Sequence, residues 1–305
     1  MSAFPVARAQ TQPAAAARTS RRIRPRRVGL YAFLLFMSVT WLFPLLWAVY
    51  TSLRSYADTQ QNGYVSLPAS LSLDNFTSAF SQGNFPQFYF NSLVVTVPGV
   101  IVTLILASMV AFGVSKFSWR FNLLVLVLFT AGNLLPQQVI IVPLYRLYLL
   151  LPVPHPLSDN GLMYDQYLGI ILIHIIFQTG FCVFVLSNYM KTLSHELTEA
   201  ALVDGASVLR IWGGIVMPLC RPALAALATL EFTFIYNDFF WALMLMKTGD
   251  KRPITSALQN LQGEFFTNFN QLAAGALLAA IPTILVFFLL QRHFVSGLTL
   301  GSTKG

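Results

Sequence analysis

Charged side chains are scarce in this chain. Only 10% of its 305 residues are Asp, Glu, Lys or Arg, whereas a soluble globular domain carries about 25%. Hydrophobic residues make up 56%. Too few polar groups are present to cover a folded surface in water, so the composition argues against a soluble protein and indicates a membrane protein.

Cysteine and histidine are also rare. The two cysteines, Cys182 and Cys220, fall in separate apolar runs, which is neither a disulfide framework nor a metal pair. They are expected to be small buried side chains. The histidines are too scattered for metal-ligand spacing; they are His155, His174, His195 and His293. The sequence therefore predicts no metal site.

Enzyme motifs are missing. The chain contains no G-x-x-x-x-G-K-[ST] phosphate loop, no H-E-x-x-H zinc pair and no G-x-S-x-G elbow. The glycines of "GASVLRIWGG" do not follow a strand, so they do not predict a dinucleotide site. The chain is expected to be no enzyme and to bind no cofactor, so ATP that drove it would have to be bound by another chain.

Long apolar runs are abundant. A membrane-spanning helix needs roughly 20 apolar residues, because its backbone must satisfy its own hydrogen bonds. The sequence predicts an all-α integral membrane protein with six such spans, the fifth being the least regular because it holds Glu231, Asn237 and Asp238. The predicted spans are residues 29–50, 90–114, 122–149, 167–189, 219–245 and 272–291.

Basic residues indicate the orientation of the spans. Lys and Arg near span ends favour the cytoplasmic side, and with a cytoplasmic N-terminus fourteen of the nineteen fall inside. Both termini are therefore predicted to be cytoplasmic. The net charge of +8 comes largely from a basic tail over residues 1–28 that includes "RRIRPRR". We expect this tail to be disordered and to contact anionic lipid rather than nucleic acid. A cleaved signal peptide is disfavoured, since the run is long and lacks a small-x-small site.

A polar stretch interrupts the apolar runs between the fourth and fifth spans, in "SHELTEAALVDGASVLRIWGGIVMP". Ser194 is expected to cap a short helix, and Gly205 occupies the position favoured for a left-handed C-cap. Ser207 would cap a second short helix, and Pro218 would open the next span. The pattern predicts two short helices bent around a glycine at the cytoplasmic face. An interfacial amphipathic loop is the plain alternative.

The same stretch resembles the cytoplasmic signature of ABC importer permeases, E-A-A-x(3)-G-x(9)-I-x-L-P, with Met217 in place of the usual Leu. Three further segments look like the carbohydrate-uptake, maltose-type branch of that family: "LLPQQVIIVPLYRLY", "YNDFFWALMLMKTGDKRPITSAL" and the terminal "HFVSGLTLGSTKG". The resemblance covers roughly residues 29–305. It implies a permease domain over residues 29–296, with a coupling loop at about 191–218 and a cytoplasmic tail at 297–305.

The resemblance also implies partners and a mechanism. They are a second permease subunit, two ATPase subunits that bind ATP and Mg, and an extracytoplasmic solute-binding protein, assembled at the cytoplasmic membrane. The coupling loop would dock on an ATPase and transmit its movement to the spans while sugar or polyol crosses by alternating access. The residues implied in this coupling are Glu199, Ala200, Ala201, Asp204, Gly205, Ile215 and Pro218.

Polar residues within the spans are candidates for a substrate pathway, because an ionisable group in lipid is costly unless it faces protein or water. Glu231 and Asp238 would share one face of a continuous helix, and aromatic, amide and carboxylate groups suit a sugar. The candidates are Glu231, Tyr236, Asn237, Asp238, Trp241, Asn133, Gln137, Gln138, His174 and Gln178. Interhelical packing is the alternative role for each of them.

Two other readings remain open from the sequence. The Glu-Ala-Ala loop is shared by importers of phosphate, amino acids and peptides, so a non-sugar solute is possible. A secondary transporter would use Glu231 and His174 as a proton relay. By resemblance, the segment after the fifth span, residues 247–271, either reaches into the binding protein or is a plain connector with a short interfacial helix.

Overall fold

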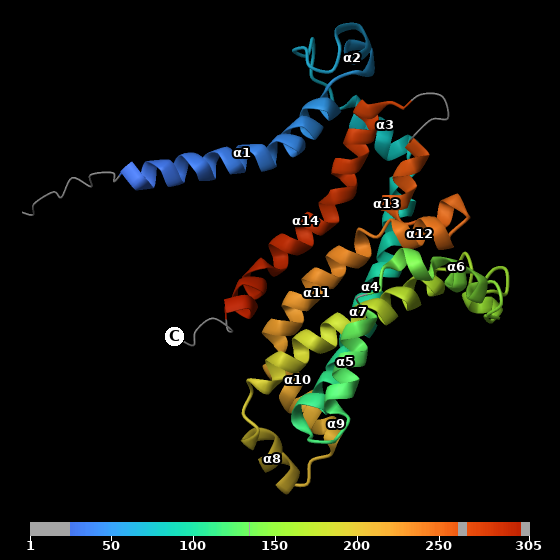
Figure 1. Cartoon of the computed structure of the whole chain (residues 1–305). Helices are drawn as coiled ribbons and strands as arrows, with labels where there is room; N and C mark the ends of the chain where they lie inside the picture. Colours follow the sequence, from blue (N-terminus) through green and yellow to red (C-terminus); the bar gives the residue numbers. More distant parts are fainter. Residues whose placement is uncertain (1–24, 134, 262–266, 300–305) are drawn as a thin grey trace, which may run out of the picture. The chain divides into compact units, whose positions relative to one another are not determined.

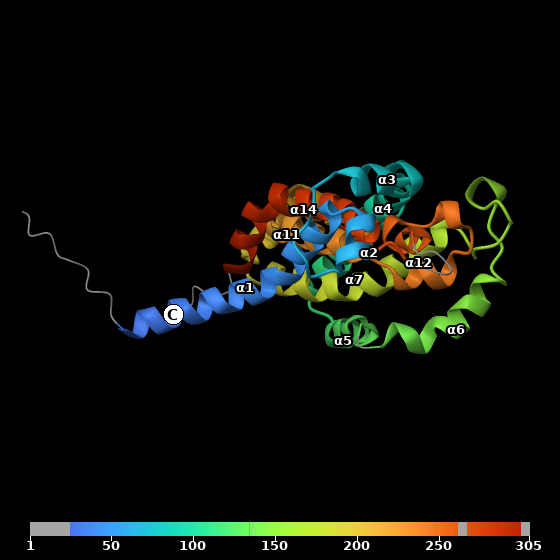
Figure 2. The same cartoon turned by 90° about the horizontal axis from the view of Figure 1, so that it is seen from above.

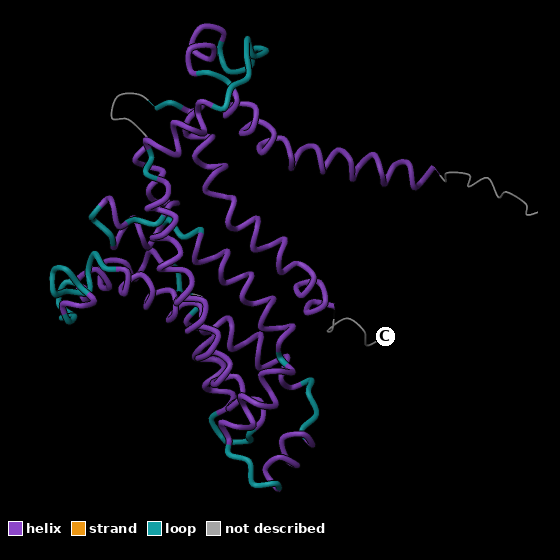
Figure 3. Tube along the Cα trace, turned by 180° about the vertical axis from the view of Figure 1, so that it is seen from behind, coloured by secondary structure: helices purple, strands orange, loops and turns teal. Residues whose placement is uncertain are grey.

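The computed structural model describes residues 25–133, 135–261 and 267–299. Within these ranges the chain forms helices joined by loops, and the only β-pairing is two isolated bridges (Figure 3). The chain divides into two compact units, Met1–Trp47 and Ala48–Gly305. The first unit contains most of helix α1 (Pro25–Leu53), and all other helices belong to the second.

Four helices of the described chain are long and apolar enough to cross a membrane. They are α1, α4 (Phe85–Lys116), α7 (Tyr167–Lys191) and α14 (Phe269–Thr299). Each contains one predicted span, so these four apolar runs are confirmed as helices of spanning length. Two bent helix pairs raise the number of candidate spans to six if each pair counts as one.

The third predicted span, residues 122–149, is wrong as one continuous helix. It consists of α5 (Asn122–Gly132) and α6 (Gln137–Tyr148), bent by 91° relative to each other (Figure 2). Pro136 has extended backbone at the start of α6. Proline donates no backbone N–H and disfavours helix in the residue before it, which explains a break at this point. Leu134 lies outside the described residues.

The fifth predicted span, residues 219–245, is also wrong as one helix. α11 (Arg221–Tyr236) ends before α12 (Phe240–Leu245) begins. Asn237 turns its side-chain amide back to the Thr233 carbonyl at 2.8 Å, and Asp238 bonds the first amides of α12. Such local side-chain bonds compete with helical ones. The premise that Glu231 and Asp238 lie on one continuous helix therefore fails.

A helical hairpin of short elements joins α7 to α11. α8 (Glu196–Val203) is followed by α9 (Val208–Ile211), the π-helical turn η2 (Trp212–Val216) and α10 (Met217–Leu219). The run from Val208 to Leu219 is bent by 79° relative to α11. Pro218 opens α10, while α11 begins at Arg221 with Pro222 in its first turn. The expectation that Pro218 opens the next span is thus wrong by three residues.

Short helices also occupy the connections that the orientation prediction places outside the cell. They are α2 (Tyr56–Asn62), α3 (Asp74–Gln82), η1 (His155–Leu157), η3 (Gly249–Lys251), α13 (Ile254–Ala257) and η4 (Leu258–Leu261). In Figure 1, α2 and α3 lie at one end of the second unit, and α8 and α9 lie at the other.

The core of the second unit forms where α4 packs along α7 and where α11 packs against α14 and α4. Small residues make these contacts close: Ala107 and Ala111 of α4 and Cys182 of α7 are fully or almost fully buried in one cluster. Small residues are common at helix contacts in membranes, because they let backbones approach. Cys220 is buried in the same cluster and both cysteines are free, as expected.

The predicted terminal regions lie largely outside the described residues, so their bounds stay predictions. The basic tail is expected over residues 1–28, and residues 1–24 lie outside the described residues, while α1 already begins at Pro25. The C-terminal tail is expected from residue 297, but α14 continues to Thr299. Residues 300–305 lie outside the described part of the chain.

Candidate functional site

The polar stretch folds as a helix, a glycine turn and a second helix. α8 begins at Glu196 with His195 at its N-cap, which makes no side-chain capping bond, so the expectation that Ser194 caps this helix is wrong by one residue. Ser194 instead accepts a hydrogen bond from the Glu196 amide at 3.2 Å. Gly205 has a φ of +78°. Its amide donates to the Leu202 carbonyl at 3.1 Å, and the next amide, of Ala206, reaches the Ala201 carbonyl at 3.0 Å. These two bonds form a Schellman C-cap, which glycine adopts without strain.

The second short helix is capped as the sequence predicts. The Ser207 hydroxyl accepts from the Arg210 amide at 3.4 Å, at the start of α9. The predicted architecture of two short helices around Gly205 is therefore present. Its location at the cytoplasmic face stays a prediction, because the structure contains no membrane.

This hairpin has one packed side and one open side. Ala201, Ile211 and Val216 are buried in the cluster between α4, α7 and α11. On the open side Val203 is 87% exposed and Leu209 is 65% exposed. An apolar side chain with this much exposure at the tip of a helical turn gains little from its own chain, so the open side is chemically suited to contact another protein.

The residues assigned to coupling divide between these two sides. Glu199, Ala200, Asp204 and Gly205 are exposed, whereas Ala201 is buried and Ile215 and Pro218 are half-buried. The hairpin is also attached to the spans, since Lys116 at the end of α4 donates from Nζ to the Leu193 carbonyl at 2.8 Å. The hairpin is therefore joined to α4 by this bond and to α7 and α11 by the chain itself.

The buried acid Glu231 lies where α11 meets α7. Its side chain has no exposed surface, and its Oε1 accepts a hydrogen bond from Sγ of Cys182 at 3.2 Å. Its other oxygen has no partner among the described residues. Glu231 thus faces protein, as an acid at membrane depth should, and contacts α7 instead of lipid.

Asp238, His174 and Trp241 form a second polar cluster beside α7. Asp238 accepts hydrogen bonds from the amides of Trp241 and Ala242, both at 3.2 Å, and its Oδ2 lies 3.6 Å from Nε2 of His174. The Trp241 ring is fully buried and lies 5.4 Å from the ring of Phe177, also on α7. Glu231 and Asp238 therefore both face α7, although they do not share a helix.

Tyr236 and Asn237 face a different neighbour. Tyr236 is 1% exposed and donates its hydroxyl to the Ala279 carbonyl of α14 at 3.2 Å. Asn237 is exposed and its amide reaches Oγ1 of Thr283, also on α14, at 3.2 Å. These two residues join α11 to α14, so the predicted polar set is spread over two faces.

The remaining candidates lie near the break between α5 and α6. Asn133 donates from Nδ2 to the Phe129 carbonyl at 3.2 Å, and its own backbone amide bonds to nearer carbonyls. Gln137 and Gln178 are half-buried, and Gln138 is exposed. A Cβ atom added to Gly180 of α7 would overlap both the Phe129 oxygen and the Asn133 amide, so α5 ends directly on α7.

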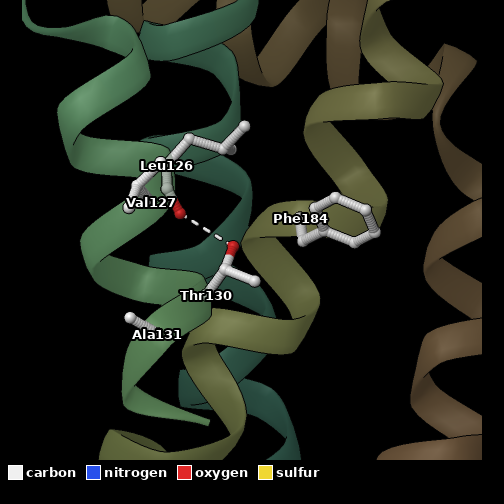
Figure 4. Close-up of a pocket in the computed structure, with 5 residues that line it drawn as sticks. All are labelled: Leu126, Val127, Thr130, Ala131 and Phe184. Atoms are coloured by element: carbon white, nitrogen blue, oxygen red, sulfur yellow. Dashed lines mark hydrogen bonds between the residues drawn. The ribbon is translucent and has the colours of Figure 1, made fainter. Parts of the chain in front are cut away.

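An open apolar cavity of about 290 Å³ lies beside the contact between α5 and α7 (Figure 4). It is lined by Leu126, Val127, Thr130, Ala131 and Phe184. The only hydroxyl, that of Thr130, is bonded to the Leu126 carbonyl at 2.7 Å. This cavity therefore offers no free polar group for a sugar and does not belong to the predicted pathway.

A set of buried polar side chains at the end of α1 was not expected from the sequence. Arg54 is 1% exposed and pairs with Asp58 at 2.8 Å. It also donates to the carbonyls of Gly63 and Tyr64. Asn270, from the start of α14, donates to the Thr51 and Arg54 carbonyls at 2.9 and 3.2 Å. The Arg-Asp spacing of four residues after a span is the one signal that pointed to this cluster.

Asn91 is a second buried side chain that the sequence did not single out. Its Nδ2 donates to the carbonyls of Asp250 and Arg252, at 2.7 and 3.0 Å. Its Oδ1 accepts from the Tyr167 hydroxyl at 2.7 Å. Nothing in the local pattern around Asn91 indicates that it binds a loop far along the chain.

Among the described residues, no group of three or more His, Cys, Asp or Glu could hold a metal ion.

Comparison with known proteins gives one family and a consistent set of relatives. Residues 99–300 match the family described as binding-protein-dependent transport system inner membrane component. The chain is 30% identical to a probable ABC transporter permease protein, YurM, of Bacillus subtilis, over 92% of each chain. It is 28% identical to the arabinooligosaccharides transport system permease protein AraQ of the same organism, over 92% of this chain and 96% of that protein.

A solved structure has the same fold. It is the crystal structure of a bacterial ABC transporter involved in the import of the acidic polysaccharide alginate, one chain of which matches with a TM-score of 0.74. The match has 23% sequence identity and covers 90% of this chain and 98% of the other. The fold therefore agrees over most of both chains.

Proposed function

Because the chain belongs to the family of binding-protein-dependent transport inner membrane components, we propose that it is the membrane-spanning subunit of an ATP-driven importer for a sugar or related polyol. The main support is the hairpin of α8 and α9, which has the Glu-Ala-Ala and glycine spacing and an open apolar side. Relatives such as AraQ are described as carbohydrate permeases, which supports a sugar as cargo.

The proposed assembly has four kinds of subunit. This chain would pair with a second permease, two ATPase subunits would bind ATP and Mg, and a solute-binding protein would deliver the sugar. The second match among solved structures is an alginate transporter in complex with a periplasmic protein, with a TM-score of 0.62. Hydrolysis would then belong to the partners, in keeping with the lack of a phosphate loop here.

In this mechanism the hairpin transmits force and does not touch cargo. The open side, with Glu199 and the exposed apolar tip, would contact an ATPase subunit. Closure of the ATPases would move the hairpin, and the buried side would carry that movement into α4, α7 and α11. Alternating access requires such a rigid connection between an energy-coupling site and the spans.

The substrate pathway is proposed to run beside α7, where Gln178 is half-buried and the buried pair of Asp238 and His174 borders it. Amide groups such as that of Gln178 can bond sugar hydroxyls, whereas Trp241 is fully buried and so would support the pathway without covering a sugar face. Asn237 and the residues around the α5–α6 break, Asn133, Gln137 and Gln138, are further candidates. Glu231 and Tyr236 are fully packed against α7 and α14, so they would support the pathway from behind.

The proposal is tested by uptake in membranes containing the whole assembly. Gly205→Pro and Glu199→Lys should abolish uptake of every sugar and its stimulation of ATP hydrolysis, while the chain still inserts. Gly213→Ala is the matched control, because a Cβ atom there meets no neighbour and its backbone is helical. Normal transport by either coupling variant would contradict the docking role.

The alternatives give different results in the same assay. A non-sugar importer would show ATP-dependent uptake, but its binding protein would bind another solute in calorimetry. A proton-coupled secondary transporter would show uptake by this chain alone, driven by a proton gradient and indifferent to ATP. Uptake of that kind would overturn the permease-subunit proposal.

A further inference from the structure

The short break between α11 and α12 is held from three sides by one residue. The Asp238 carboxylate bonds the two amides at the start of α12, at 3.2 Å each. Its backbone carbonyl accepts the hydroxyl of Thr255 in α13. Its Oδ2 faces Nε2 of His174 in α7 at 3.6 Å. Asp238 therefore fixes where α11 ends relative to α7, α12 and α13.

The segment on the α12 side of this break is bonded to its surroundings. Asp165 accepts the amides of Lys247 and Thr248 at 2.8 and 3.0 Å, directly after α12. Ser92 of α4 accepts the Ile254 amide at 2.8 Å, and Asn91 holds the carbonyls in between. α12 and the loop after it thus form one body with the neighbouring ends of α4 and α7.

The α11 side of the break is held differently. α11 is connected to the run Val208–Leu219, which contains part of the proposed coupling hairpin. Its described side-chain bonds to other spans are one to α7, between Cys182 and Glu231, and one to α14, from the Tyr236 hydroxyl to the Ala279 carbonyl. The rest of its contact with α7 and α4 is apolar packing around residues such as Leu227. Apolar contacts are not directional, so they permit sliding more readily than the bonds around α12 do.

The His174 contact is incomplete in this state. The imidazole is 4% exposed, yet its Nε2 has no hydrogen-bond partner among the described residues. The 3.6 Å separation from Asp238 is too long for a hydrogen bond but close enough for one to form after a small shift. A buried donor or acceptor without a partner is costly. A second arrangement in which His174 and Asp238 form this hydrogen bond would therefore gain stability.

We propose that the Asn237–Asp238 break is a pivot about which α11 turns relative to α12 during transport, and that His174 and Asp238 are the positioning residues of this pivot. This proposal rests on the proposed function, because transport supplies the movement of α11. It assigns to the two side chains a mechanical role in place of direct contact with the cargo. Hinges in other proteins are likewise a few residues at element ends.

Paired spin labels on the complete assembly in nanodiscs test the pivot directly. Arg221 at the start of α11 and Met244 in α12 are both exposed, and their distance should change between the nucleotide-free and the vanadate-trapped states. The control pair, Val97 of α4 with Met244, should keep one distance. The native cysteines are buried, so labelling of the chain without new cysteines gives the background.

Each outcome of this measurement bears on the proposal. A change in the first pair alone supports a pivot at the break. No change in either pair shows that α11 and α12 are rigidly joined and overturns it. A change in both pairs shows that α12 moves against α4, which also overturns it. These distances respond to ATP whatever the cargo is, so an error in the sugar assignment would not affect them.

Substitutions test the positioning residues. His174→Leu and Asp238→Leu should lower the maximal uptake rate several-fold for every sugar while leaving the half-saturating concentration unchanged. His174→Gln, which keeps a donor, and Asp238→Asn, which keeps an acceptor for the α12 amides, should recover part of that rate. Altered sugar selectivity would assign the pair to cargo contact and overturn the positioning role, as would equal losses in the Leu, Gln and Asn variants.

Discussion

At the scale of single residues, two glycines act in opposite ways. Gly205 is needed for its backbone, because its φ is +78° and a Cβ atom there would meet open space. Gly180 is needed for its lack of a side chain, because α5 ends on it. The first could be recognised from the sequence by its position after a short helix. The second could not, since its neighbours, Phe129 and Asn133, lie on another span.

Gly180→Ala should destabilise the protein. The added methyl overlaps a backbone oxygen, which cannot rotate away, so α5 must shift at a cost of about 1–3 kcal/mol. Thermal unfolding of the purified chain in detergent should show a lower midpoint. Gly113→Ala in α4 is the control, because no atom lies within 4 Å of its added Cβ, and it should leave the midpoint unchanged or raise it. Equal midpoints for both variants would show that the α5–α7 contact is looser than described.

At the scale of elements, the sequence predicted helices well and their interruptions poorly. Runs of apolar residues define α4, α7 and α14, since any long apolar segment must be helical in lipid. The break before Pro136 follows from the proline itself, and the break at Asn237–Asp238 follows from side-chain bonds to the neighbouring backbone. A search for runs of about 20 apolar residues does not register one proline or asparagine. The polar candidates were found, but their distribution between α7 and α14 follows from those breaks.

The connection between α1 and α4 should unfold more readily in acid. The side-chain bond from Asn62 and then the Arg54 guanidinium hold the pKa of Asp58 below its usual range. A depressed carboxyl pKa stabilises the folded form above the unfolded pKa, about 3.9, and this contribution is lost as pH falls through the folded pKa. The midpoint temperature of thermal unfolding should therefore decrease as the pH is lowered from about 5 through the folded-state pKa of Asp58.

Asp58→Asn should remove that part of the pH dependence while lowering stability at neutral pH. Asp250→Asn, which changes an exposed carboxyl in another loop, should leave the pH dependence as it is in the wild type. Hydrogen exchange of the α2 region across the same pH range would locate the change. An unaltered acid transition in Asp58→Asn would assign acid sensitivity to other carboxyls.

At the scale of the whole molecule, the orientation in the membrane follows from charge alone and is directly testable. Val65 is 86% exposed and Val203 is 87% exposed, on segments predicted to lie on opposite sides of the membrane. Val65→Cys should react with a membrane-impermeant maleimide in cells whose envelope has been made permeable outside the inner membrane. Val203→Cys should react only after the inner membrane is also permeabilised. The reverse pattern would invert the predicted topology.

The bonds that bind α12 to α4 and α7 also bear on how the chain is made. Asn91 and the Asp250 carbonyl are 159 residues apart in the chain, and Ser92 and the Ile254 amide are 162 apart. Contacts this distant cannot form until the later partner has been synthesised. During translation, Asn91 and Ser92 of α4 must wait without these partners until the chain has been synthesised past residue 254. A ribosome stalled before that point would leave a nascent chain whose spans are inserted but not yet fastened, and such a chain is a natural substrate for membrane chaperones and proteases.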